Sequence, residues 1–412
     1  MTSPLFEPLP LAHGAPLPNR LAKAAMEEQL ACDGQLPGPR MFQLYESWSR
    51  GGVGLILTGN VMVDARALTS AGGIVLDAET PLEPFRRWAD AAHSGGARLW
   101  MQINHPGRQV PAELPGVKLA PSAVGLDLGA QSKRFATPEA MTSGQIEEAI
   151  EAFVTTARRA VEAGFDGVQI HAAHGYLLSQ FLSPLSNQRD DEWGGDLEGR
   201  SRALREVVRR TRAALPDDVA VAVKLNSADF QRGGFDVDDA AQVVRMLGHL
   251  GVDLVELSGG SYESPAMQGR ARDGRTLQRE AYFLGFAEQI AAVAPMPLML
   301  TGGVTRKETA EKVLAAGVDV VGIGTALSLV PDLPARWQDA SPEATPSLRL
   351  GTFKDKAIAS AARQAQVRYQ LRRLAKGRNP RPAASPLSIL LKDQLLNRAN
   401  RRRYSAWLAR RG

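Results

Sequence analysis

The sequence contains a single cysteine, Cys32, and no hydrophobic run long enough to cross a membrane. One thiol excludes an internal disulfide, a multi-cysteine zinc site and a cysteine-held iron–sulfur cluster. A spanning helix needs about 18 or more consecutive apolar residues, and the mean hydropathy of this chain is −0.19. The first twenty residues hold five prolines and no apolar segment, unlike an ordinary secretory signal. We therefore expect a cytoplasmic protein.

Nucleotide-binding signatures are also missing, because no G-x-G-x-x-G follows a predicted strand and no Walker A motif occurs. Instead, short β-branched runs alternate with longer helical patterns, as in βα units. Eight units in about 350 residues favour a (β/α)8 TIM barrel over a doubly wound open sheet. The predicted strands are Arg20–Met26, Val53–Thr58, Leu99–Ile103, a strand ending at His171, Val219–Leu225, Leu254–Leu257, Leu298–Leu300 and Val318–Ile323.

The predicted helices alternate with these strands. They span residues 40–50, 83–93, 142–163, 197–215, 237–250, 276–294 and 306–316. The third begins at a capping-box pattern, in which Thr142 is followed three residues later by Gln145.

Charge is distributed unevenly along the 412 residues. Residues 351–412 carry 16 Lys and Arg against 2 Asp and Glu, a net charge of +14, whereas residues 1–350 carry 33 against 42, a net charge of −9. Two helical patterns in the basic segment are separated by the sequence NPRPAASP, which breaks a helix. We predict two parts, a barrel over residues 1–350 and a basic helical extension over 351–412.

Polar residues gather where the predicted strands end, which is where barrel enzymes carry their chemistry. Gly302, Gly303 and Gly324 follow the last two strands, a common phosphate site in barrels. His171 and His174 follow the fourth strand, and Tyr176 is two residues further on. A catalytic zinc would need a third protein ligand, so two imidazoles that bind one carbonyl oxygen are the better interpretation. Tyr176 is suited to donating a proton to a carbanion.

Lys224 lies within the apolar strand VAVAVKLN, where an inward-facing ammonium needs an anion. It could form a Schiff base, as in barrel aldolases, or face an anionic cofactor. Gln102, also within an apolar strand, suits the edge of a heterocycle. Together with a phosphate site, these residues describe a pocket for flavin mononucleotide (FMN).

The segment HAAHGYLLSQFLSPLSNQRDDEWGGDLEGRSR, His171 to Arg202, closely resembles the signature of the Old Yellow Enzyme family, the NADH:flavin oxidoreductases. Supporting similarities occur in order at PLPNRLAKAAM, GGVGLILTGN, MQINHPGRQ, VAVKLNSADF, LMLTGGV and VVGIGTAL, so the resemblance covers about residues 5–335. It implies a TIM barrel that holds FMN non-covalently, takes electrons from NADH or NADPH, and passes hydride to an electron-poor alkene.

The resemblance also implies roles for individual residues. His171 and His174 would bind the substrate carbonyl oxygen, and Tyr176 would donate the proton. The implied cofactor-binding residues are Ala24, Ala25, Met26, Glu27, Asn60, Gln102, Lys224, Gly302, Gly303, Gly324 and Thr325. Of these, Gln102 and Lys224 would contact the flavin ring and Gly303 and Gly324 its phosphate.

The chain departs from the family pattern at three of these positions. Ala25 stands where many members have proline, and Thr325 where many have a phosphate-binding arginine. Glu27 stands where threonine or cysteine is usual. A carboxylate facing the flavin should lower its potential, whereas one bound to Lys23 or to a loop should have little effect.

The expected partners are a small-molecule substrate, NADH or NADPH, and further copies of this chain in a homo-oligomer. The acidic body and the basic tail attract each other, so we expect the tail to pack on the barrel or on a neighbouring subunit. No metal is expected, and a membrane surface is not an expected partner. No nucleic acid is expected either, since no known nucleic-acid-binding motif accompanies the charge. A Schiff-base lyase using Lys224 and a protein that acts through its tail on a membrane or nucleic acid are the competing readings.

Overall fold

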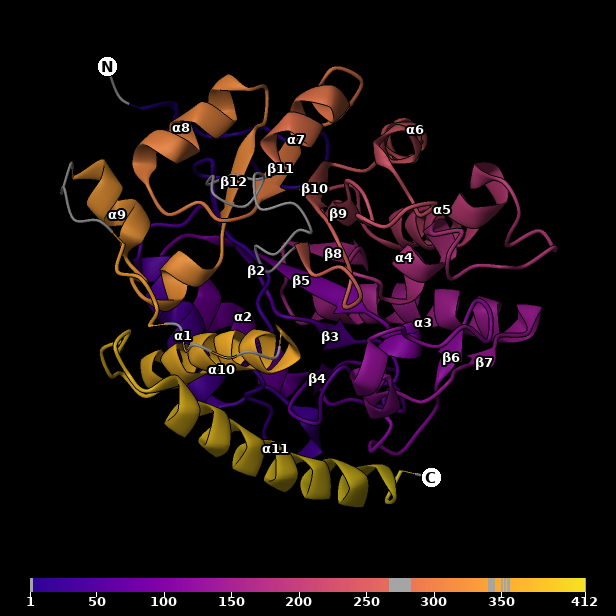
Figure 1. The fold of residues 1–412 in the computed structure, drawn as a ribbon. Coiled ribbons are helices and arrows are strands. Elements are labelled where there is room, and N and C mark those ends of the chain that lie inside the picture. The colour runs from indigo at the N-terminus through magenta and orange to yellow at the C-terminus, as the bar shows by residue number, and fades with distance from the viewer. Residues whose placement is uncertain are drawn as a thin grey trace.

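Eight parallel strands close into a barrel (Figure 1). This computed structural model describes residues 3–266, 283–339, 345–349, 351, 353 and 356–411. β1 pairs with β2 on one side and with β12 on the other, so the barrel has no open seam. The prediction of a (β/α)8 barrel is confirmed, and the alternative of an open doubly wound sheet is wrong. The barrel strands are β1 (Leu21–Lys23), β2 (Leu55–Leu57), β5 (Arg98–Asn104), β8 (Gly167–Ala172), β9 (Ala220–Asn226), β10 (Leu254–Ser258), β11 (Leu298–Thr301) and β12 (Val320–Ile323).

Helices cover the outside of the barrel. They are α1 (Pro39–Arg50), α2 (Glu83–His93), α3 (Ser143–Glu162), α4 (Leu177–Leu182), α5 (Leu197–Ala214), α6 (Val237–Gly248), α7 (Leu284–Ala291), α8 (Lys307–Ala315) and α9 (Leu333–Gln338). The capping box is present, because Thr142 Oγ1 accepts from the Gln145 N–H while Gln145 Oε1 accepts from the Thr142 N–H. The first part of the helix predicted over 276–294 lies outside the described residues; α7 accounts for the rest.

Two short additions come from the loops. β3 (Val61–Met62) and β4 (Ile74–Val75) extend the sheet beyond β5, and β6 (Leu119–Ala120) pairs with β7 (Glu139–Ala140). The Gly- and Pro-rich stretch between β5 and α3 thus contains a small two-stranded sheet.

The strand period of two sorts side chains between the two faces of the barrel wall. Leu55, Leu57, Trp100, Ala222 and Leu254 face inward and form an apolar cluster. Their outward neighbours pack under the helices in a separate, larger cluster. One layer further toward the strand ends the inward residues become polar, beginning with Gln102, Gln169, Lys224 and Glu256. The inward-facing polar side chains of these strands therefore lie in the layers nearest the strand ends.

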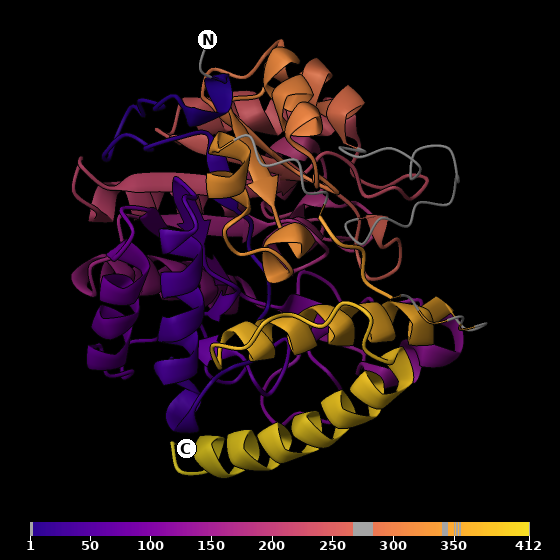
Figure 2. The same cartoon turned by 90° about the vertical axis from the view of Figure 1, so that its left-hand side faces the viewer.

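The basic extension forms two long helices, α10 (Lys356–Leu374) and α11 (Pro386–Leu408), which lie side by side along one flank of the barrel (Figures 1 and 2). α10 packs on α1 and on the turn Thr325–Ser328 after β12. Arg411 forms ion pairs with Asp77 and Glu79, and Arg401 with Glu113. The predicted attraction between tail and body thus acts within one chain, and the helical extension is confirmed. The division into two domains at residue 350 stays a prediction.

Tyr404 anchors α11. Its ring is fully buried with Met62, Leu68 and Val75, and its hydroxyl donates to the Ala65 carbonyl oxygen at 2.9 Å. Among the described helices, α11 included, none has a stretch long and apolar enough to cross a bilayer.

Replacing Tyr404 with alanine should release α11 from the barrel. Truncating a large buried aromatic side chain costs about 3–5 kcal/mol. We expect faster hydrogen exchange throughout α11 and faster trypsin cleavage in its arginine-rich half. Gln394→Ala is the matched control, because Gln394 lies on the same helix and is exposed. Equal protection of α11 in Tyr404→Ala and in the unmodified chain would contradict this anchoring role.

Candidate active site

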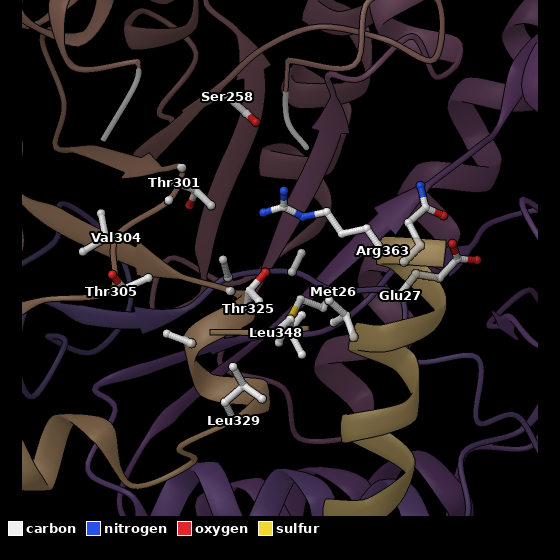
Figure 3. A pocket seen from close by; sticks show the side chains of 18 of the residues that line it. Met26, Glu27, Ser258, Thr301, Val304, Thr305, Thr325, Leu329, Leu348 and Arg363 are labelled. Atoms are coloured by element: carbon white, nitrogen blue, oxygen red, sulfur yellow. The ribbon is translucent and has the colours of Figure 1, made fainter. Parts of the chain in front are cut away.

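A cavity of about 570 Å³ opens where the strands end (Figure 3). Eleven of the predicted site residues line it: Ala24, Ala25, Met26, Glu27, His174, Tyr176, Lys224, Gly302, Gly303, Gly324 and Thr325. These come from five strands or the loops directly after them, so barrel closure alone brings them together. Three other predicted residues, Asn60, Gln102 and His171, are not part of its lining.

His171 is not part of the cavity lining, but its ring contacts two residues that are, His174 and Tyr176. Its ring contacts His174 edge to face at a centroid distance of 5.1 Å and Tyr176 at 4.9 Å. The Ala173 N–H donates to His171 Nδ1 at 3.2 Å, which leaves Nε2 as the protonated nitrogen. The three predicted catalytic side chains therefore form one cluster.

The backbone of His174 adopts an unusual conformation. Its φ is +62°, in the left-handed region that few non-glycine residues adopt. The His174 N–H donates to Asn226 Oδ1 at 3.0 Å, and His174 Nε2 lies 2.7 Å from Ser258 Oγ. Side chains from β9 and β10 thus hold the histidine in a strained position, as is common at functional sites.

Both imidazoles are neutral at pH 7. Burial lowers the pKa of His171 well below its usual 6.5, and the nearby charges of His174 and Lys224 add to this. Burial, followed by Lys224, also lowers the pKa of His174 well below 6.5. Each neutral ring therefore carries one N–H group and one lone pair, and the lone pair of His171 Nδ1 is occupied by the Ala173 N–H.

Tyr176 is paired with a second phenol, Tyr262, which follows β10. The two hydroxyl oxygens lie 3.2 Å apart, and both side chains line the cavity. Burial raises the pKa of Tyr176 well above 10, with Tyr262 and Glu27 contributing, and burial raises the pKa of Tyr262 to about 12. Both phenols stay protonated and can donate. Sequence reasoning missed Tyr262, although its place after a strand end was a usable signal.

A chain of buried polar side chains crosses the barrel beneath the cavity. Gln102 Nε2 donates to Gln169 Oε1 at 2.7 Å, and Gln169 Nε2 donates to Glu256 Oε2 at 2.8 Å. Lys224 Nζ lies 2.7 Å from Glu256 Oε1. The anion that Lys224 requires is thus a protein carboxylate. Glu256 is likewise a charged residue within an apolar strand, LVELS, and the same argument from the sequence could have identified it.

Glu27 reaches the cavity edge but is held by a loop. Its Oε1 accepts hydrogen bonds from the hydroxyls of Thr69 at 2.7 Å and Ser70 at 2.6 Å. Lys23 is paired instead with Glu28, at 3.3 Å. Of the two expectations for Glu27, the structure supports the carboxylate bound to a loop.

The turns after β11 and β12 suit a bound phosphate group. Gly303 has a φ of +73°, which favours glycine, and a side chain at Gly324 would meet only Met26 in otherwise open space. Thr301 Oγ1 is buried and has no hydrogen-bond partner among the described residues. An unpartnered hydroxyl beside open glycine turns fits a ligand rich in oxygen atoms, such as the ribityl phosphate chain of FMN.

The extension also contributes to the cavity wall. Arg363, Gln364, Val367 and Arg368 of α10 line it, as does the segment 345–348 (Figure 3). No local sequence pattern indicated this, because it depends on packing between residues far apart in the chain.

The glycine turns after the last two strands and the neutral donors at the mouth of the closed barrel fit a flavin-dependent TIM-barrel oxidoreductase. The chain belongs to the NADH:flavin oxidoreductase / NADH oxidase family, which residues 4–343 match. The predicted family, the oxidoreductase class and FMN as the cofactor are thereby confirmed.

Similar proteins agree with this assignment. The chain is 38% identical over 353 residues to an NADH-dependent flavin oxidoreductase of Neonectria, covering 80% of this chain and 46% of that protein. It is 35% identical to a protein of the same description from Hypocrea jecorina, covering 79% and 87%. The solved Old Yellow Enzyme homologue from Zymomonas mobilis is 26% identical, with a TM-score of 0.69, covering 82% of this chain and 93% of that one.

The neutral histidines predict how stability depends on pH. Their folded pKa values lie below the 6.5 of the unfolded chain, so between these values the unfolded chain binds more protons. Their contribution is therefore complete above pH 6.5 and declines as the pH falls below it. We expect the melting temperature to fall between about pH 7.5 and pH 5.

The double variant His171→Asn/His174→Asn should have a flatter profile, with a remaining slope from His105, whose pKa is also lowered by burial. His249→Asn, at an exposed site, is the control and should keep the original slope. An equal slope in the double variant would mean that the two imidazoles do not cause the acid sensitivity.

Proposed function

We propose that this enzyme reduces the activated C=C bond of an α,β-unsaturated carbonyl compound or a similar electron-poor small molecule. The observation that carries the proposal is the cluster at the cavity mouth: two neutral imidazoles in edge-to-face contact and a protonated phenol against one of them. An imidazole N–H pair can stabilise charge that develops on a carbonyl oxygen. FMN, when bound, supplies the hydride.

In this proposal His171 and His174 orient the substrate. Their N–H groups bind its carbonyl oxygen, and burial keeps both rings neutral and close to the cofactor cavity. Asn226 and Ser258 are positioning residues, because they hold His174 in its left-handed conformation. No rearrangement of the rings is then needed when charge develops.

Tyr176 would deliver the proton that completes alkene reduction. Its hydroxyl is protonated, lies at the cavity surface and contacts Tyr262, which can replace the donated proton. Glu27, held by Thr69 and Ser70, keeps its carboxylate away from this transfer.

The remaining predicted residues would hold FMN. Ala24, Ala25 and Met26 would pass its ring, and Lys224 would face its pyrimidine edge, with charge balanced by Glu256. Gly302, Gly303, Gly324 and Thr325 would contact the phosphate chain. We propose an indirect role for Gln102 and Asn60, which stand outside the cavity lining. Gln102 fixes the Gln169–Glu256 pair that holds Lys224. Asn60 lies near Tyr176 and lowers the pKa of its hydroxyl, opposing the effect of burial.

The names of similar proteins support this proposal without fixing the substrate. The solved structure is an Old Yellow Enzyme homologue, and the curated relatives are described as NADH-dependent flavin oxidoreductases. The chain spans about half the length of one of those relatives. The Schiff-base alternative gains no support from the geometry, because Lys224 Nζ is engaged by Glu256.

Replacing Tyr176 with phenylalanine tests the proton-transfer step. Alkene reduction should slow by about 10²–10⁴-fold, because general acid catalysis is lost. Reduction of the flavin by NADH should change little, since it needs no proton from this phenol. Stopped-flow absorbance separates the two half-reactions, with 2-cyclohexenone as the acceptor.

Tyr262→Phe is the matched control and should slow alkene reduction less than Tyr176→Phe, because Tyr262 only resupplies the proton. Equal slowing of both half-reactions in Tyr176→Phe would assign that side chain a role in pocket shape alone. Absence of any alkene reduction by the unmodified holoenzyme would overturn the proposed function itself.

We further propose that the enzyme works in the cytoplasm as a homo-oligomer that uses the outer face of α11. Leu387, Leu391 and Leu395 recur at helical spacing there and are 58%, 54% and 62% exposed. A second copy suits this face, because its barrel segment carries a net charge of −9 and the tail +14.

Replacing both Leu391 and Leu395 with glutamate should lower the mass measured by light scattering, because charge would be placed in an apolar interface. Lys392→Glu is the control, since it changes charge on the same helix and leaves the leucines intact. A monomer in the unmodified chain would refute the oligomer. Loss of binding to anionic vesicles at unchanged mass would assign the leucine face to a membrane surface instead.

A further inference from the structure

The cofactor cavity lacks a basic side chain at the turns where a phosphate would bind. Residues 302–305 and 324–326 contain no lysine or arginine, and Thr325 has an uncharged side chain. A phosphate monoester carries about −1.5 to −2 charges at pH 7. Backbone N–H groups can bind its oxygen atoms, but they leave this charge uncompensated in a partly buried site.

Three basic side chains line the described part of the cavity, and two of them already have acidic partners. Lys224 pairs with Glu256 at 2.7 Å, and Arg368 pairs with Asp393 at 2.6 Å. The third, Arg363, has neither an ion pair nor a hydrogen bond among the described residues. A half-buried guanidinium without a partner is available for a ligand anion.

The side chain of Arg363 points into the cavity. Figure 3 shows it extending from α10 toward the side of the cavity that Ser258, Thr301 and Thr325 line. Thr301 and Thr325 belong to the ends of β11 and β12, and Thr301 Oγ1 is the buried hydroxyl without a partner. An unpaired cation and an unpartnered hydroxyl thus face the same space.

The rest of α10 is fixed firmly enough to aim this side chain. Ala362, Ala365 and Leu371 are buried, and Gln366 Nε2 donates to the carbonyl oxygens of Arg349 and Ala384. The cavity-facing positions 363, 364, 367 and 368 form one edge of the helix.

We propose that Arg363 binds the phosphate group of FMN, so that the C-terminal extension completes the cofactor site in place of a basic residue in the barrel. The inference rests on FMN as the cofactor and is independent of alkene reduction. Its distinguishing consequence is selectivity for FMN over riboflavin, because the two flavins differ only in the phosphate.

Titrating the full-length chain, freed of flavin, with FMN and with riboflavin tests the proposal through the quenching of flavin fluorescence. Loss of a charge-assisted hydrogen bond should raise the dissociation constant of Arg363→Ala for FMN by about 10- to 100-fold. The constant for riboflavin should change less than about twofold, since no phosphate contact is lost. Arg363→Lys should retain part of the selectivity as a point charge.

Arg402→Ala is the matched control, because it removes one exposed positive charge from the same extension and should change neither constant. Equal weakening of both flavins in Arg363→Ala would show that the side chain contributes packing only, and unchanged FMN binding would exclude any contact. Either result overturns the proposal. If Arg363→Ala fails to fold by circular dichroism, an undiminished preference for FMN in Arg363→Gln overturns it as well.

Discussion

Closure of the parallel sheet is the constraint on which every other feature of this molecule depends. Eight parallel pairings, among them β1 with β12 and β2 with β5, join all eight strands in one direction around a common axis. Their carboxyl ends meet at a single rim, and residues such as Met26, His174, Lys224 and Gly303 come together there although long stretches of chain separate them. An open sheet with the same strands would distribute these side chains along an edge.

Desolvation then determines the charge state of the site. A charged group inside the barrel is costly unless it is paired, and Lys224 and Glu256 satisfy each other directly. Among the described residues, no carboxylate pairs with His171 or His174, and burial keeps both rings neutral. The histidine–tyrosine cluster therefore offers N–H and O–H donors that are themselves uncharged, which suits a neutral carbonyl substrate.

The extension joins this arrangement through contacts far apart in the sequence. Tyr404 anchors α11 under the loop that contains Ala65, and α10 presents Arg363 to the cavity. Asp393, one of two acidic residues in the extension, is buried between Arg368 and Arg372 and connects the two helices. The basic tail is thus part of the active-site wall. Part of its charge is used within the chain, in the ion pairs of Arg368, Arg372, Arg401, Arg403 and Arg411.

The sequence by itself determined the order of strands and helices, the capping box at Thr142 and most of the rim residues, because the strand period and short-range glycine and capping preferences act locally. The signature from His171 to Arg202 also indicated the family. Local patterns gave no sign of which groups meet across the barrel: Glu256 opposite Lys224, Tyr262 beside Tyr176, Thr69 and Ser70 on Glu27, and Arg363 over the turns after β11 and β12. Only the tertiary structure decided these partners, because a buried polar group takes whichever partner packing brings within hydrogen-bond distance, and that distance is independent of separation along the chain.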